Sequence, residues 1–158
     1  MKTLIVYATK HGSAEKCGNL VKNKLSGDVD LINLKKSSHI QLVDYDTIMI
    51  GGSIHAGKIQ KRVKQFCQRN LQTLMQKKVG LFICCMEESE KAQDEFDRAF
   101  SVELRNHSSA NGIFGGEFNF DRMNFIEKAI IKKVAHIDQS MSKISEEKIH
   151  RFVDQIKK

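Results

Sequence analysis

A short turn of small and hydroxylated residues follows the first apolar run of the chain. The run Leu4-Ile5-Val6-Tyr7-Ala8 is typical of a buried strand, and the turn after it reads Thr9-Lys10-His11-Gly12-Ser13-Ala14. An amphipathic helix is predicted to start at about Ser13, which would place backbone N–H groups and hydroxyls at a helix N-terminus. Such an end attracts a phosphate, because its free N–H groups and the helix dipole are both positive. The turn therefore predicts a phosphate-binding loop, with an ordinary strand-to-helix turn as the alternative.

A second loop, Gly51-Gly52-Ser53-Ile54-His55-Ala56-Gly57-Lys58, follows the third predicted strand. Its glycines allow the backbone to approach a flat ligand closely, and Ser53 can supply a hydrogen bond. The first loop lacks both the three spaced glycines of a dinucleotide fingerprint and the Gly-Lys-Ser/Thr ending of a nucleoside-triphosphate loop. The two loops together therefore predict a site for a flat ligand that carries a phosphate.

The elements that must position these loops alternate between strand-like and helix-like periods. The predicted strands are 2–8, 28–34, 47–52, 79–86 and 112–118, and the predicted helices are 13–25, 58–76, 89–106 and one starting near Ser145. The strands are continuously apolar, which indicates a parallel sheet covered on both faces. We expect one α/β domain over residues 1–158, with a five-stranded parallel sheet in the order 2-1-3-4-5. A ligand should then bind at the switch point between strands one and three.

Residues 122–136 are surplus to this plan. They lie between the fifth strand and the last helix, and they carry Lys128, Lys132 and Lys133. The apolar residues of the segment would share one helical face: Met123, Ile126, Ile130, Val134 and Ile137. A basic amphipathic helix can lie on a membrane or cover a bound apolar substrate. The alternative is a helix that packs its apolar face on its own domain.

The distribution of charge limits the kinds of partner that the protein could bind. The net charge is +7, and between Thr47 and Met86 there are lysines and arginines but no acidic residue, so one face should attract anions. An anionic membrane surface or an acidic small molecule fits this charge, and a solvated basic helix without a partner is the alternative. No aromatic platform or zinc spacing accompanies the charge, so we expect no nucleic-acid partner.

The four cysteines also show no metal-ligand spacing, and we expect no metal site. Free thiols, and the lack of a signal peptide or of an apolar run near the roughly 20 residues of a membrane span, predict a cytoplasmic protein. Residues 122–136 would allow peripheral contact with the inner face of the cell membrane. The oligomeric state is left open.

The chain resembles the flavodoxin family, and within it the menaquinone-dependent protoporphyrinogen IX dehydrogenases. The matching features are the opening Met-Lys-Thr-Leu-Ile, the loop Thr9–Gly12, Ile50-Gly51-Gly52-Ser53-Ile54-x-x-Gly57, Phe66, and an insertion that begins with Asp121-Arg122. The resemblance implies a flavodoxin-like three-layer sandwich with FMN as the cofactor. The residues that it assigns to cofactor binding come from both loops and from the end of the fourth strand: Thr9, Lys10, His11, Gly12, Ser13, Ala14, Ser53, Ile54, His55, Ala56, Gly57, Cys85, Met86 and Glu87.

The resemblance further implies an FMN-dependent oxidoreductase that oxidises protoporphyrinogen IX, in haem biosynthesis, with a quinone or another electron acceptor. Its partners would be porphyrinogen-like or quinone-like small molecules. Positive charge on His55 and Lys58 would stabilise an anionic reduced flavin, which favours an enzyme. No side chain is assigned as an obligatory acid or base.

Two alternatives stay open. The first is a flavodoxin-type electron carrier for a redox partner. The second is a phosphoacceptor receiver, although that class needs clustered carboxylates where this chain has Ala8-Thr9 and Gly52-Ser53. One departure from the family concerns the phosphate: His11 and Ala14 stand where many flavodoxins have threonine, so hydroxyl contacts are missing there.

Overall fold

A parallel sheet forms the centre of the protein in the computed structural model, which describes residues 1–37, 39–135 and 139–158. Its strands are β1 (Lys2–Ala8), β2 (Asp28–Asn33), β3 (Thr47–His55), β5 (Lys78–Cys84) and β6 (Ala110–Ile113). They lie in the order β2-β1-β3-β5-β6, and all four pairings along this path are parallel. The predicted order 2-1-3-4-5 is confirmed.

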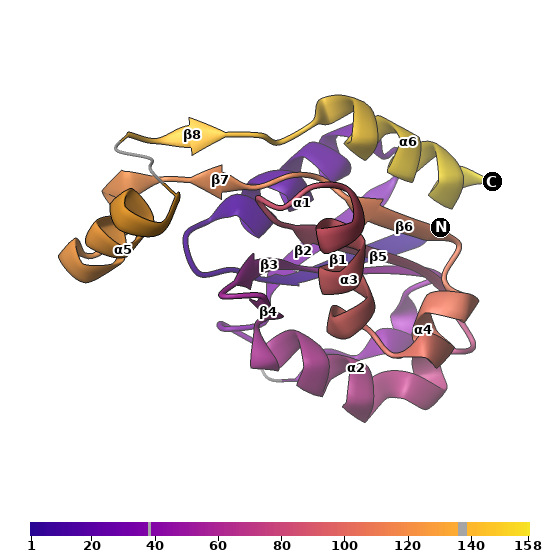
Figure 1. Cartoon of the computed structure of the whole chain (residues 1–158). Coiled ribbons are helices and arrows are strands. Elements are labelled where there is room, and N and C mark those ends of the chain that lie inside the picture. Colours follow the sequence, from indigo (N-terminus) through magenta and orange to yellow (C-terminus); the bar gives the residue numbers. More distant parts are fainter. Residues whose placement is uncertain (38, 136–138) are drawn as a thin grey trace.

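Helices cover both faces of this sheet (Figure 1). The helices α1 (Ser13–Lys24) and α6 (Glu146–Lys157) cover one face, and α2 (Lys61–Leu74), α3 (Ser89–Ala99) and α4 (Val102–His107) cover the other. The expected single helix over 89–106 is wrong, because Phe100 and Ser101 have extended backbones between α3 and α4. Ser101 caps α4 by accepting a hydrogen bond from the Leu104 N–H at 3.3 Å, a common role for serine.

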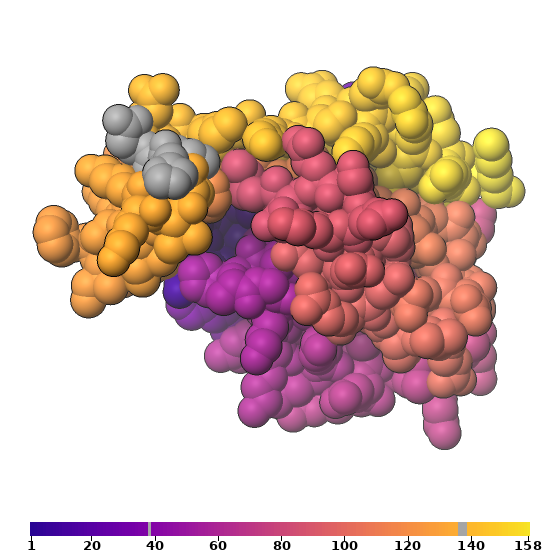
Figure 2. All heavy atoms as spheres, viewed as in Figure 1, coloured from indigo at the N-terminus to yellow at the C-terminus, as the bar shows by residue number. Residues whose placement is uncertain are grey.

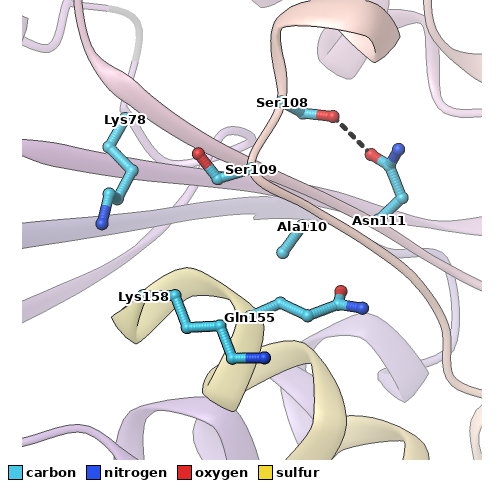
Figure 3. A pocket seen from close by; sticks show the side chains of 7 residues that line it. All are labelled: Lys78, Ser108, Ser109, Ala110, Asn111, Gln155 and Lys158. Carbon is cyan, nitrogen blue, oxygen red and sulfur yellow. Dashed lines mark hydrogen bonds between the residues drawn. The ribbon is translucent and has the colours of Figure 1, made fainter.

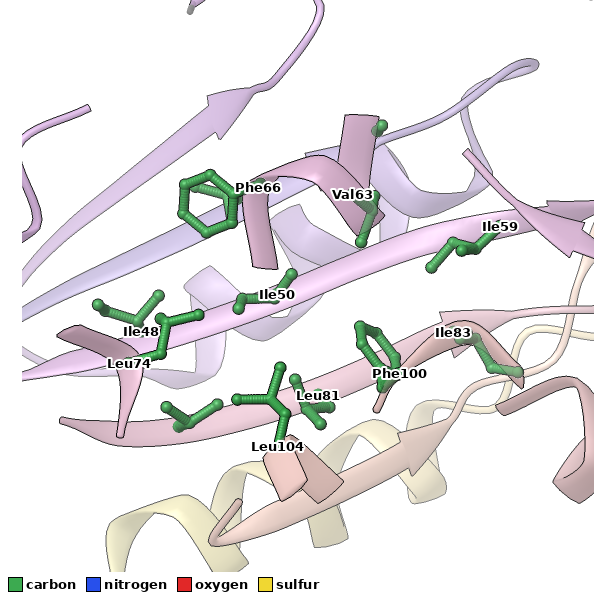
Figure 4. Close-up of a cluster of buried hydrophobic side chains, with 14 of the residues drawn as sticks. Ile48, Ile50, Ile59, Val63, Phe66, Leu74, Leu81, Ile83, Phe100 and Leu104 are labelled. Atoms are coloured by element: carbon green, nitrogen blue, oxygen red, sulfur yellow. The ribbon is translucent and has the colours of Figure 1, made fainter. Parts of the chain in front are cut away.

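The two cores explain the continuously apolar strands. On one face, Ile48, Ile50, Leu81 and Ile83 pack against side chains of α2 and α4 (Figure 4). On the other face the rings of Phe82, Phe114 and Phe152 lie with centroids 5.1–6.0 Å apart. Both faces of each central strand are therefore buried, as the sequence pattern indicated.

The second loop of the sequence is a hairpin. β3 continues to His55, and β4 (Lys58–Ile59) turns back antiparallel to it, with Ile54 opposite Ile59. The turn residues Ala56 (φ 49°) and Gly57 (φ 74°) both have left-handed backbones, as a two-residue hairpin turn requires. The prediction that the strand ends at Gly52 and that a helix starts at Lys58 is therefore wrong.

The segment before the last helix forms a separate unit. β6 ends at Ile113, short of the predicted 118, and β7 (Glu117–Phe118) pairs instead with β8 (Met141–Ser142). Between them lie a 3-10 turn, η2 (Phe120–Arg122), and the helix α5 (Phe125–Ala135). We call residues 119–135 the insertion, and it projects beside the body of the molecule (Figures 1 and 2).

The apolar face of α5 is exposed. Only Met123, ahead of the helix, is buried, whereas the exposed fractions are 86% for Phe125, 69% for Ile126, 53% for Ile130 and 74% for Val134. No residue of α5 is buried. The alternative in which this face packs on its own domain is therefore wrong for the described residues, while residue 136 and Ile137 lie outside them. In the part of the chain that the structure describes, no helix has the length and apolar character to cross a bilayer.

Candidate functional site

Three predicted segments meet at the carboxyl edge of the sheet. Ala8 at the end of β1 lies beside Gly52 of β3, and Ser53 lies beside Cys84 at the end of β5. Since these strands are parallel neighbours, the turn 9–14, the hairpin 53–57 and the segment 85–87 all leave the sheet at the same edge. This edge is where open α/β sheets bind their ligands.

The turn after β1 has the geometry of an anion cradle. Gly12 is the N-cap of α1 with φ 99°, and its N–H donates to Oγ1 of Thr9 at 3.0 Å. No side chain caps α1, so the N–H groups of its first turn have neither an intrahelical nor a capping acceptor. Ala14 is fully buried in the core, so it offers the site only its backbone N–H. A phosphate fits this end of the helix.

Ser53 joins the turn to the hairpin. Its Oγ accepts hydrogen bonds from the Lys10 N–H at 3.3 Å and from Nε2 of Gln60 at 2.8 Å, while its own N–H donates to Oε1 of Gln60 at 3.2 Å. The sequence reading missed Gln60, because only the fold of the hairpin returns it to Ser53. This network holds the two predicted loops in a fixed relation.

A basic hollow of about 360 Å³ lies between the turn and the hairpin. Thr9, Lys10, Lys35, His55, Lys58, Ile59 and Gln60 line it, and none of these residues is acidic. The pKa of His55 lies below its ordinary value, because burial and the nearby charges of Lys10 and His11 disfavour the imidazolium. The positive charge of the hollow therefore comes from its lysines. The expectation that His55 adds a charge of its own is wrong near neutral pH.

The segment after β5 lines a different hollow. Cys85, Met86 and Glu87 border a space of about 220 Å³, together with residues such as Lys143 and Ser89. Burial is the main reason that the pKa of the Cys85 thiol rises to about 12, so this sulfur stays protonated. The structure thus brings 85–87 to the predicted edge, where Cys85 is a packed thiol and no nucleophile.

The insertion contacts the turn through side chains that the sequence reading did not assign. Glu127 Oε2 lies 2.6 Å from Nε2 of His11 and 3.4 Å from Nζ of Lys10. Nδ1 of His11 donates to the backbone carbonyl of Arg122 at 3.0 Å. Both ring nitrogens of His11 thus face oxygen atoms of the insertion. His11 and Lys10 therefore hold the insertion beside the turn.

Glu127 is ionised in this cluster. Partial burial opposes its charge, but the charge and hydrogen bond of His11 and those of Lys10 outweigh it, so the pKa of Glu127 lies below its ordinary value. Ligand atoms of His11, His55 and Glu127 lie within 4.8 Å of one another and have the chemistry of a metal site. The Lys10 ammonium contacts two of these residues, at 3.1 Å from Nε2 of His55 and 3.4 Å from Glu127, and its charge opposes a cation there.

A larger hollow lies at the other edge of the sheet. Its lining includes Lys78, Ala110 and Lys158, and its volume is about 580 Å³ (Figure 3). Lys78 begins β5, whereas the predicted segment 85–87 follows the end of that strand, about 20 Å away at the usual rise of a strand. This hollow contains no residue of the predicted site.

The profile of the Flavodoxin domain family matches residues 4–145. Oxidised Flavodoxin 1 from Bacillus cereus is similar in fold, with 14% identity and a TM-score of 0.54 over 99% of this chain and 95% of that chain. An oxidoreductase from Corynebacterium diphtheriae has 11% identity and a TM-score of 0.57 over 99% of this chain and 94% of that chain. At these identities the two structures show a shared fold.

Rubredoxin oxygen:oxidoreductase from the anaerobe Desulfovibrio gigas is a longer protein, of which the chain covers 23%. That match has 21% identity and a TM-score of 0.46 over 52% of this chain. No curated protein matches the chain in sequence.

Proposed function

This chain belongs to the flavodoxin domain family, and on that premise we propose that it is an FMN-dependent redox protein acting on an apolar reactant. When bound, FMN supplies the electron-transfer chemistry, and the protein supplies its position and electrostatic surroundings. The uncapped first turn of α1 and the left-handed Gly12 support this cofactor, because they suit a terminal phosphate. The turn 9–14 is the segment that would hold it.

The hairpin sets the charge around the cofactor in this proposal. Lys10 and Lys58 line the hollow next to the hairpin turn, and no acidic side chain lines it with them. Positive charge there favours an anionic, two-electron-reduced cofactor over the neutral form. A protein tuned in this way suits an oxidoreductase that accepts two electrons from its substrate.

The reactant class is proposed from one observation, the exposed apolar face of α5 beside the turn. Phe125, Ile126, Ile130 and Val134 are all exposed on a helix that Glu127 ties to His11 and Lys10. A large apolar patch that contacts water is unfavourable unless a ligand, a membrane or a partner covers it. We assign this face to a porphyrinogen or quinone, with oxidation of protoporphyrinogen IX as the specific reaction.

The same helix carries the proposed membrane contact. Lys132 and Lys133 are exposed on α5 together with the apolar residues. Anionic lipid attracts such lysines, while the apolar side chains enter the interface. A peripheral site on the membrane would give the protein access to a lipophilic quinone.

An electron-transfer role is the second candidate. The exposed face of α5 is equally suited to a redox partner protein, because apolar residues surrounded by lysines are common in docking surfaces. In that case the protein would exchange electrons with a reductase and would not turn over a porphyrinogen itself.

A cofactor and turnover experiment separates these proposals. The purified protein is reconstituted with FMN, the released cofactor is identified by mass spectrometry, and anaerobic protoporphyrinogen IX oxidation is followed with and without menaquinone. We expect FMN in the protein and turnover that depends on the quinone. Failure to bind any flavin would defeat the redox proposal altogether. Bound FMN without porphyrinogen turnover, but with rapid reduction by a flavodoxin reductase, would favour the electron carrier.

A further inference from the structure

The side chain of Arg122 lies directly over the phosphate-binding turn. A Cβ added to Gly12 would collide with Nη1 and Cζ of Arg122, so the guanidinium occupies the space above the left-handed glycine. Arg122 belongs to η2, more than 100 residues along the chain from the turn. The insertion thus places a permanent positive charge at the N-terminus of α1.

The position of Arg122 is held on both sides. Its carbonyl accepts the hydrogen bond of His11 Nδ1, and its own N–H donates to the carbonyl of Asn119 at 3.1 Å. The following residue, Met123, is buried. On the first turn of α5, Glu127 pairs with His11 and Lys10. The backbone of Arg122 is therefore fixed against the turn.

The guanidinium itself has no anionic partner in the protein. Among residues 1–37, 39–135 and 139–158, no carboxylate lies within ion-pair distance of it. The turn also offers few side-chain donors of its own, because His11 points to the insertion and Ala14 is buried in the core. A phosphate at this turn would meet backbone N–H groups, the hydroxyls of Thr9 and Ser13, and the Arg122 guanidinium.

We propose that Arg122 is the cationic ligand of the flavin phosphate and that Glu127 is a positioning residue, which holds the insertion over the turn. This inference rests on the proposed FMN site. A guanidinium suits the role because its planar donors match phosphate oxygens and it keeps its charge at every physiological pH. The insertion would then contribute to cofactor affinity and to selectivity for the phosphorylated flavin.

Paired flavin titrations test this assignment. Apoprotein is titrated with FMN and with riboflavin, which has the same ring system but no phosphate, and quenching of flavin fluorescence gives each Kd. Arg122→Ala should weaken FMN binding about tenfold or more, on the scale of a hydrogen bond between charged groups, and should leave riboflavin binding unchanged. Arg122→Lys should recover part of the FMN affinity. Arg69→Ala, which removes an exposed arginine from α2, is the matched control and should change neither Kd.

Two further readouts isolate the charge and the positioning role. The Kd of the wild type for FMN should rise with ionic strength, because salt screens the attraction between Arg122 and the phosphate. The Kd of Arg122→Ala should rise less, because this variant lacks that attraction. Glu127→Gln should weaken FMN binding, and it should add nothing in the Arg122→Ala background if it acts through Arg122. Tighter FMN binding by Glu127→Gln would instead show that this carboxylate only repels the phosphate.

The possible results of these titrations distinguish a failure of this inference from a failure of the proposed function. A wild type that binds FMN while Arg122→Ala keeps its affinity within twofold would overturn the role of Arg122 and leave the flavoprotein proposal standing. An equal loss of FMN and riboflavin affinity in Arg122→Ala would also overturn it, because the residue would then support the fold of the site. A wild type that binds neither flavin would defeat the proposed function, and this inference with it.

Discussion

Removing the exposed apolar face of α5 is the sharpest test of the reactant class. The variant combines Phe125→Ser, Ile126→Ser, Ile130→Ser and Val134→Ser, and it leaves Arg122 and Glu127 in place. These side chains are 53–86% exposed, so most of their apolar surface is free to enter a lipid interface or to cover a reactant. At 1.5–3 kcal/mol for a fully buried side chain of this size, each contributes about 1–2 kcal/mol, and the four together about 4–8 kcal/mol.

This energy corresponds to a loss of membrane affinity of about a thousandfold or more, since 1.4 kcal/mol is a factor of ten. Co-sedimentation with vesicles of phosphatidylcholine and phosphatidylglycerol measures it, and turnover of menaquinone in the same vesicles should fall with it. Reduction of ferricyanide should not change, because a small soluble acceptor needs no apolar cover. The melting temperature should stay close to that of the wild type, because substitutions of exposed residues change stability by only about 0.5 kcal/mol each.

The control replaces two apolar residues that are exposed elsewhere, Val43→Ser and Val102→Ser. It should bind vesicles and reduce menaquinone as the wild type does. Unchanged vesicle binding and menaquinone turnover in the α5 variant would refute the proposed role of this face. An unfolded α5 variant would refute the reasoning too, because it would mean that the face is buried in the folded protein.

Three other substitutions probe the hairpin and the core. Lys58→Glu should lower the midpoint potential of the two-electron couple, since it replaces a positive charge of the basic hollow by a negative one, and potentiometry would show no change if Lys58 points away from the cofactor. Gly51→Ala should lower the free energy of unfolding by about 1–3 kcal/mol in urea titrations, because its Cβ would collide with the buried ring of Phe82; an unchanged midpoint would contradict this packing. Glu95 is buried with one carboxylate oxygen lacking a hydrogen bond, and burial raises its pKa, so its ionisation destabilises the fold as the pH rises through that pKa. Glu95→Gln should therefore raise the melting temperature at pH 8 relative to the wild type and have a smaller effect at pH 4, and an equal shift at both values would contradict the assignment.

The sequence by itself predicted the sheet and its order. β1 was predicted with the bounds that the structure has, because five consecutive apolar residues between polar neighbours fit only a strand buried on both faces. The start of α6 was also predictable, since Ser145 caps the helix by accepting a hydrogen bond from the Lys148 N–H. These features depend on residues that are close together in the sequence, so a local pattern is enough to predict them.

The hairpin shows where local patterns mislead. The predicted strand ended at Gly52 because Gly51 and Gly52 indicated the start of a loop, yet β3 continues to His55, and Gly51 leaves space for the Phe82 ring of the neighbouring strand. The need for that space comes from a residue on another strand. No reading of the segment alone could distinguish a glycine that allows close packing from a glycine that allows a turn.

Part of the candidate site was predictable from the sequence, and part of it was not. The position of the turn and the hairpin was predictable, because the loops that follow parallel strands all lie at the carboxyl edge of the sheet. Glu127 and Arg122 were not, since they reach the turn from 116 and 111 residues away in the sequence. An amphipathic pattern is the same whether its apolar face packs inward or faces water. Only the tertiary structure decided the direction, because the polar contacts of Glu127 with Lys10 and His11 hold α5 against the turn and leave its apolar residues exposed.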